Sequence, residues 1–117
     1  MGKIKFGAVV NEVPQMSVSP DYLGLARLLQ VCEDANFDSA WVMDHLVWGP
    51  SSAVFECWTT LSALSRESSR IRIGSFLLSN GFRNPALVAK MAATLDIISQ
   101  GRLELGIGAG WKEDEYR

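Results

Sequence analysis

The adjacent residues Asp44 and His45 are the side chains best suited to chemistry, and His45 is the only histidine of the chain. They follow a short β-rich run, residues 39–43, so we expect them at the carboxyl end of a strand. An imidazole beside a carboxylate can hold a hydrogen-bonding group or move a proton near neutral pH. The structural alternative is that Asp44 caps the following loop while His45 packs against Trp48. The residues alone leave both interpretations open.

A glycine-rich turn with the sequence GIGAGW, residues 106–111, follows a second predicted strand. It does not match the dinucleotide-binding pattern G-x-G-x-x-G, because the third glycine falls at Trp111. Glycines there would still let the backbone approach a planar ring or an anion closely. A core position for Trp111 is the alternative interpretation.

Alternating strands and helices must position these residues. Apolar alternation or β-rich composition predicts strands at about 3–10, 39–43, 70–78 and 102–107. Apolar residues at helical spacing predict three intervening helices, and the acidic residues after Trp111 predict the start of another. The order βαβαβαβ indicates a parallel α/β sheet with right-handed crossovers. Ligands bind at the carboxyl ends of such strands, which is where Asp44, His45 and the glycine-rich turn are expected.

Capping residues predict where the helices begin and end. Ser19 is expected to cap the first helix, with Pro20 at its first position and the last turn near Asn36. Asn84 followed by Pro85 predicts the start of the third helix, and Gly101 its end.

Strand parity predicts an ion pair on the face of the sheet that the helices do not cover. Leu103, Leu105 and Ile107 alternate with Glu104, and Ile71 and Ile73 flank Arg72. If the aliphatic faces meet the helices, Arg72 and Glu104 share the other face on neighbouring strands. A charge taken out of water must be paired, so we expect an interior Arg72–Glu104 ion pair. An edge exposed to solvent is the alternative.

Composition excludes several function classes. With 11 Lys and Arg against 13 Asp and Glu, the formal charge is −2, which gives no reason to expect nucleic acid or an anionic membrane as partner. No apolar run is long enough to span a bilayer, and the first ten residues lack the features of a signal peptide. Cys32 and Cys57 lie in helical patterns without metal-ligand spacing, which predicts no metal site and buried thiols in a reducing cytoplasm.

The 117 residues conflict with the architecture that the elements suggest. A closed barrel of strand–helix units needs roughly 250 residues, so we expect an incomplete domain over 1–117. A complete flavodoxin-like domain is a weaker alternative, because it needs five strands and the pattern provides four.

Three segments together resemble a known family. FDSAWVMDHLVWG (37–49), FECWTTLSALSRESSRIRIG (55–74) and GFRNPALVAKMAATLDIISQGRLELGIGAGWKEDEYR (81–117) are similar, in this order, to the bacterial luciferase-like monooxygenase superfamily, especially its deazaflavin-dependent oxidoreductase branch. The resemblance implies a TIM barrel of eight βα units, of which this chain would be the N-terminal half.

The resemblance also implies cofactors and site residues. The cofactor would be FMN or the 5-deazaflavin coenzyme F420, bound at the carboxyl ends of the strands. Asp44 and His45 would contact the ring or the substrate. A non-proline cis peptide in a bulge at Phe76–Leu77 would lie behind the ring. The residues Gly108, Ala109, Gly110 and Trp111 would form one wall.

The function implied is hydride transfer or oxygenation of a small organic substrate, in a protein that forms a homodimer when full length. Trp111 replaces the glutamate of the family's sugar-phosphate dehydrogenases, which argues against that substrate class. Asn84–Pro85 stands where many relatives have His-Pro, and the segments that complete the cofactor's phosphate site lie beyond Arg117. A non-catalytic flavin-binding or structural half-barrel is the alternative function.

Overall fold

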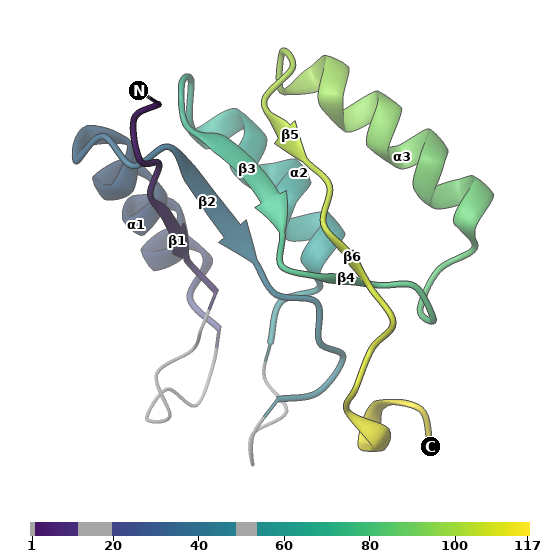
Figure 1. Cartoon of the computed structure of the whole chain (residues 1–117). Helices are drawn as coiled ribbons and strands as arrows, with labels where there is room; N and C mark the ends of the chain where they lie inside the picture. The colour runs from purple at the N-terminus through teal and green to yellow at the C-terminus, as the bar shows by residue number, and fades with distance from the viewer. Residues whose placement is uncertain (1, 12–19, 49–53) are drawn as a thin grey trace.

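The computed structural model describes residues 2–11, 20–48 and 54–117, and its centre is a four-stranded parallel sheet (Figure 1). The strands lie in the order β1 (Gly7–Val9), β2 (Ser39–Val42), β3 (Arg72–Ser75) and β5 (Leu103–Glu104). The predicted parallel βαβαβαβ arrangement is confirmed. The strands neighbour one another in chain order, as in a barrel, whereas a flavodoxin-like sheet places its first strand inside.

A second, two-stranded parallel sheet continues β3 and β5 (Figure 1). It pairs β4 (Leu78–Ser79) with β6 (Ile107–Gly108). Ile73 pairs with Leu103, and Leu78 pairs with Ile107. The segment from Ile73 to Leu78 is therefore one residue longer than the segment from Leu103 to Ile107. The extra residue defines a bulge at Phe76–Leu77, where the peptide bond is cis. The predicted cis peptide in a bulge at this dipeptide is confirmed, and the strands predicted at 70–78 and 102–107 are each in fact two short ones.

Three helices cover one face of the four-stranded sheet: α1 (Tyr22–Asp34), α2 (Cys57–Glu67) and α3 (Pro85–Ile98). The core lies between helices and sheet, where Leu29, Leu61 and Ile73 are fully buried. Both cysteines are free and buried, as predicted. No helix in the described part of the chain is long and apolar enough to cross a membrane.

The helix boundaries confirm one predicted cap and correct another. Asn84 caps α3 by accepting from Ala86 N at 2.9 Å, with Pro85 at the first position. The cap of α1 is Asp21, which accepts from Gly24 N at 3.0 Å, so the prediction of Ser19 was wrong. Either residue type can cap a helix, and the cap is the one at which the backbone leaves the helical region. Ser19 itself lies outside the described residues.

Other boundaries also differ from the prediction. The helix α1 ends at Asp34 rather than near Asn36, which has a positive φ of 60°. The acidic segment after Trp111 forms only a short 3₁₀ turn, η1 (Glu113–Glu115). At the end of α3, Gly101 has a φ of 78°, as expected of a glycine that stops a helix.

The Arg72–Glu104 ion pair exists on the sheet face opposite the helices. Arg72 Nε donates to Glu104 Oε1, and the guanidinium also reaches the Leu103 carbonyl at 3.2 Å. The side chains are 39% and 43% exposed, so the interior position was wrong for this chain. No described element covers that face.

Leu105 and Ile107 correct the parity argument for the last strand. Leu103 packs against the core as predicted, but Leu105 and Ile107 are 40% and 53% exposed. The strand pairing is interrupted after Glu104, so the simple alternation of faces does not extend through Gly106.

Glu33, near the end of α1, fixes the chain just before β3. Its carboxylate accepts from Arg70 N and Ile71 N, both at 2.8 Å, and from Ser69 N at 3.1 Å. Burial acts to raise the pKa of Glu33, but the backbone donors outweigh burial and lower the pKa below its ordinary value of 4.5.

These contacts predict a pH-dependent contribution to stability. Since the pKa of Glu33 is lower in the folded chain, its contribution is complete above the unfolded value of 4.5 and is lost as the pH falls through the folded value. Glu33→Gln should therefore lower the free energy of unfolding at neutral pH. The difference in this free energy between the variant and wild type should become smaller in acid. Urea unfolding followed by tryptophan fluorescence measures both. Asp96→Asn, on the exposed side of α3, is the control. A difference in unfolding free energy between Glu33→Gln and wild type that stays constant with pH would contradict the role of the ionised Glu33 carboxylate.

Candidate functional site

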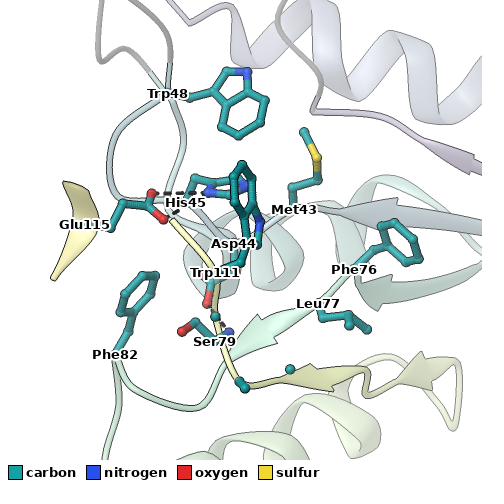
Figure 2. A pocket seen from close by; sticks show the side chains of 13 residues that line it. Met43, Asp44, His45, Trp48, Phe76, Leu77, Ser79, Phe82, Trp111 and Glu115 are labelled. Atoms are coloured by element: carbon teal, nitrogen blue, oxygen red, sulfur yellow. Dashed lines mark hydrogen bonds and ion pairs between the residues drawn. The ribbon is translucent and has the colours of Figure 1, made fainter. Parts of the chain in front are cut away.

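A cavity of about 380 Å³ opens at the carboxyl ends of the strands (Figure 2). Its wall contains every residue that the sequence analysis selected: Asp44, His45, Phe76, Leu77, Gly108, Ala109, Gly110 and Trp111. Five further residues complete the wall: Met43, Trp48, Ser79, Phe82 and Glu115. The topology brings them together because the loop after β2, the bulge before β4 and the segment after β6 all leave the same edge of the sheet (Figure 1).

Asp44 is a buried carboxylate whose hydrogen bonds within the described part of the chain are made with other segments. Its Oδ2 accepts from Ser79 N at 2.8 Å and from Arg83 Nη1 at 2.7 Å, and its Oδ1 accepts from Arg83 Nη2 at 2.9 Å. None of these donors belongs to the described part of the loop that follows Asp44, which includes residues 45–48 but not 49–53. The side chain fastens the end of β2 to β4, and its oxygens are engaged by these donors.

Arg83 continues this network to the start of α2. It also pairs with Glu56, whose carboxylate caps α2 by accepting from Trp58 N at 3.0 Å and Thr59 N at 2.6 Å. Burial acts to raise the pKa of Glu56, but the hydrogen bonds from Thr59, Arg83 and Trp58 lower it to about 2. The hydrogen bond to Asp44 raises the pKa of Arg83 above its usual value, against the effect of burial. The trio is charged and serves to position the site.

The His45 ring lines the cavity and has contacts on several sides (Figure 2). It lies against Trp48 with ring centroids 4.3 Å apart, and Trp111 meets it edge-on at 6.1 Å. Its Nδ1 lies 3.1 and 3.2 Å from the two carboxylate oxygens of Glu115. No residue in the described part of the chain hydrogen-bonds its Nε2. Packing on Trp48, the structural alternative for His45, thus coexists with a place in the cavity wall.

The segment from Lys112 to Glu115 fastens the loop that carries His45. Glu115 Oε1 accepts from Leu46 N at 2.7 Å and from Val47 N at 3.1 Å, and Lys112 Nζ donates to Val47 O at 2.9 Å. Burial acts to raise the pKa of Glu115, but these backbone donors and His45 lower it. Sequence reasoning missed Glu115; its only signal was an acidic run after a glycine-rich strand end.

Gly108 and Gly110 contribute backbone to another part of the cavity wall. A Cβ added to Gly108 would lie 3.2 Å from Leu77, and one added to Gly110 would lie 1.9 Å from the Tyr116 hydroxyl. Gly110 also has a φ of 81°, a conformation that glycine adopts without strain. The Tyr116 hydroxyl hydrogen-bonds Ser79 Oγ at 2.6 Å, which closes this side. The wall is therefore backbone at these two positions, where a side chain would have to displace Leu77 or Tyr116.

The chain is similar to several solved structures. It superposes on the monooxygenase RslO1 from Streptomyces bottropensis with a TM-score of 0.81 and 25% identity, over 97% of this chain and 35% of that one. It superposes on the coenzyme F420-dependent tetrahydromethanopterin reductase from Methanopyrus kandleri with a TM-score of 0.73 and 26% identity, over 98% of this chain and 29% of that one. These matches confirm the predicted α/β fold as part of a TIM barrel.

Curated proteins are similar in sequence. The phthiodiolone/phenolphthiodiolone dimycocerosates ketoreductase of Mycobacterium kansasii is 33% identical over 101 residues, which are 86% of this chain and 23% of that protein. The F420-dependent glucose-6-phosphate dehydrogenase of Amycolatopsis mediterranei is 35% identical over 81 residues, which are 67% of this chain and 24% of that protein. The chain thus spans about a quarter of these relatives' length.

The family model described as luciferase-like monooxygenase matches residues 5–117, nearly the whole chain. The match agrees with the parallel βα units, and with a site at the carboxyl ends of the strands. This chain belongs to the luciferase-like monooxygenase family.

Proposed function

We propose that this chain provides the ring-binding wall of an oxidoreductase that uses coenzyme F420 or FMN on a small organic substrate. The observation that carries the proposal is the cavity in which the bulge at Phe76–Leu77 and the glycines from Gly108 to Gly110 line the same space as His45. That combination joins apolar surface, open backbone and an imidazole whose Nε2 has no hydrogen-bond partner among the described residues.

The lining suits a flat, aromatic cofactor. Phe76, Leu77 and Trp111 present apolar surface, and the nearby glycines present backbone without side chains. The faces of a flavin or deazaflavin ring are apolar, and its edges carry polar atoms. When bound, such a cofactor supplies hydride transfer, or with FMN reaction with oxygen. This chain's residues would hold and orient the ring and exclude water from one side.

We propose coenzyme F420 ahead of FMN. Two of the similar proteins, the glucose-6-phosphate dehydrogenase and the tetrahydromethanopterin reductase, are named as F420-dependent. Both are at least 25% identical to this chain.

The substrate we propose is neutral and carries an alcohol or carbonyl oxygen. Among the described residues that line the cavity none is Lys or Arg, so nothing in this wall attracts a phosphate. His45 Nε2 is the group that would meet the oxygen, and a ketone is the substrate named for the mycobacterial ketoreductase. Trp111 supports the same choice, because its large apolar ring borders the place where a sugar phosphate would need polar partners.

A non-catalytic half-barrel is the second candidate function. It is favoured by the large apolar side chains that the described part of the chain leaves exposed, including Phe6 at 62% and Ile107 at 53%. Cofactor binding separates the two candidates, since a purely structural chain has no reason to select a redox cofactor.

Gly108→Val should weaken F420 binding by about tenfold or more, because the added side chain must displace Leu77, which lines the cavity. Quenching of F420 fluorescence during titration with the full chain measures the effect. Gly2→Val is the matched control, because a Cβ there meets nothing within 4 Å. Failure of the wild-type chain to bind either F420 or FMN would favour the structural candidate.

His45→Gln should retain cofactor binding but slow hydride transfer by about 10²–10⁴-fold, the usual contribution of a positioned acid or base. Stopped-flow absorbance of oxidised F420 mixed with a panel of small secondary alcohols measures the transfer, in which the alcohol would give its hydride to F420 and its hydroxyl proton to His45 Nε2. Lys90→Gln, exposed on α3, should leave the rate unchanged. Equal rates for wild type and His45→Gln would remove His45 from the chemistry.

A further inference from the structure

We propose that Glu115 is the positioning residue of His45: its carboxylate holds the imidazole proton on Nδ1 and thereby keeps Nε2 unprotonated at the cavity. The proposal rests on the proposed function for what Nε2 would meet. The residue it assigns to this role is 70 positions from His45 and is not the adjacent carboxylate, Asp44.

The donor and acceptor chemistry requires the proton to be on Nδ1. An ionised carboxylate only accepts hydrogen bonds, and both Glu115 oxygens lie 3.1–3.2 Å from Nδ1. The hydrogen bond made by one ring nitrogen sets the tautomer of the whole imidazole. A neutral His45 therefore carries its hydrogen on Nδ1 and a lone pair on Nε2.

Burial makes this contact hard to replace with water. The side chains of His45 and Glu115 are 11% and 3% exposed. The carboxylate is itself fixed, because Leu46 N and Val47 N also donate to Oε1. The lowered pKa of Glu115 agrees with an ionised acceptor. Loss of Glu115 would leave Nδ1 without a described partner in a nearly closed position.

Two kinds of contact fix the ring together. Packing against Trp48 restrains the plane of the imidazole. The hydrogen bond to Glu115 determines that the ring edge with Nδ1 faces the carboxylate. A ring flip would place a carbon against the carboxylate and forfeit the hydrogen bond. Asp44 cannot substitute, because Ser79 and Arg83 occupy its oxygens.

The test reads the tautomer directly. The chain contains one histidine, so ¹⁵N-labelled histidine gives one pair of ring signals, which His45→Gln removes as an assignment control. In the wild type near pH 8, Nδ1 should give the protonated signal and Nε2 the unprotonated one. In Glu115→Ala the Nε2-protonated form should appear. Glu113→Ala, on the same turn but exposed and paired only with Arg117, should leave the spectrum unchanged.

A second variant separates tautomer control from loss of the loop fastening. Lys112→Met removes the contact to the Val47 carbonyl and leaves Glu115 in place, so its histidine spectrum should remain that of the wild type. A wild-type spectrum in Glu115→Ala, or the same change in Lys112→Met as in Glu115→Ala, would overturn the proposal.

Activity then tests the link to function. Glu115→Ala should bind F420 within about threefold of wild type but transfer hydride from an alcohol to F420 at least about tenfold more slowly, because a ring protonated on Nε2 cannot accept the proton that the alcohol loses. If the wild-type chain binds no cofactor, the proposed function fails while the tautomer result stands. If the tautomer is unchanged in Glu115→Ala, the positioning role fails while the proposed function stands.

Discussion

A buried negative charge organises this edge of the sheet. Asp44 is almost completely withdrawn from solvent, and an unpaired carboxylate there would cost several kcal/mol. Arg83 and the Ser79 N–H compensate the charge, and Arg83 in turn holds Glu56 at the start of α2. The ends of β2 and β4 and the first turn of α2 are therefore fixed to one another before any ligand is considered. His45 lies where it does because the residue before it cannot move.

The local elements were largely predictable from the sequence. Asn84–Pro85 contains the whole signal for the start of α3, because a cap and a first-turn proline act through neighbouring backbone groups. The Arg72–Glu104 pair followed from strand parity, which needs only the two-residue period. Parity gave the wrong burial for Leu105 and Ile107, because the strand pairing is interrupted before them. The alternation of apolar and polar residues in the sequence does not show such an interruption.

The residues of the site could be predicted from the sequence, but the ion pairs that hold them could not. Asp44 and His45 are adjacent in sequence, yet they point to different partners: Asp44 pairs with Arg83, and His45 with Glu115. Those partners are 39 and 70 residues away in the sequence. The path of the chain after each strand determines which charged residue comes into contact with Asp44 and which with His45. The bulge at Phe76–Leu77 came from family resemblance, since its composition is that of an ordinary strand.

The one-residue bulge limits how this segment can vary. Leu78 is buried and Ser79 meets Asp44 only because an additional residue lies between the pairings of Ile73 and Leu78. A single insertion or deletion between Gly74 and Leu78 would turn the Leu78 side chain to the opposite face and the Ser79 N–H away from Asp44, which exposes the leucine and removes a donor from the buried carboxylate. Side chains at the bulge can therefore change with the ligand, but the number of residues cannot. Homologous or designed sequences that keep this site should differ here in residue type and not in length.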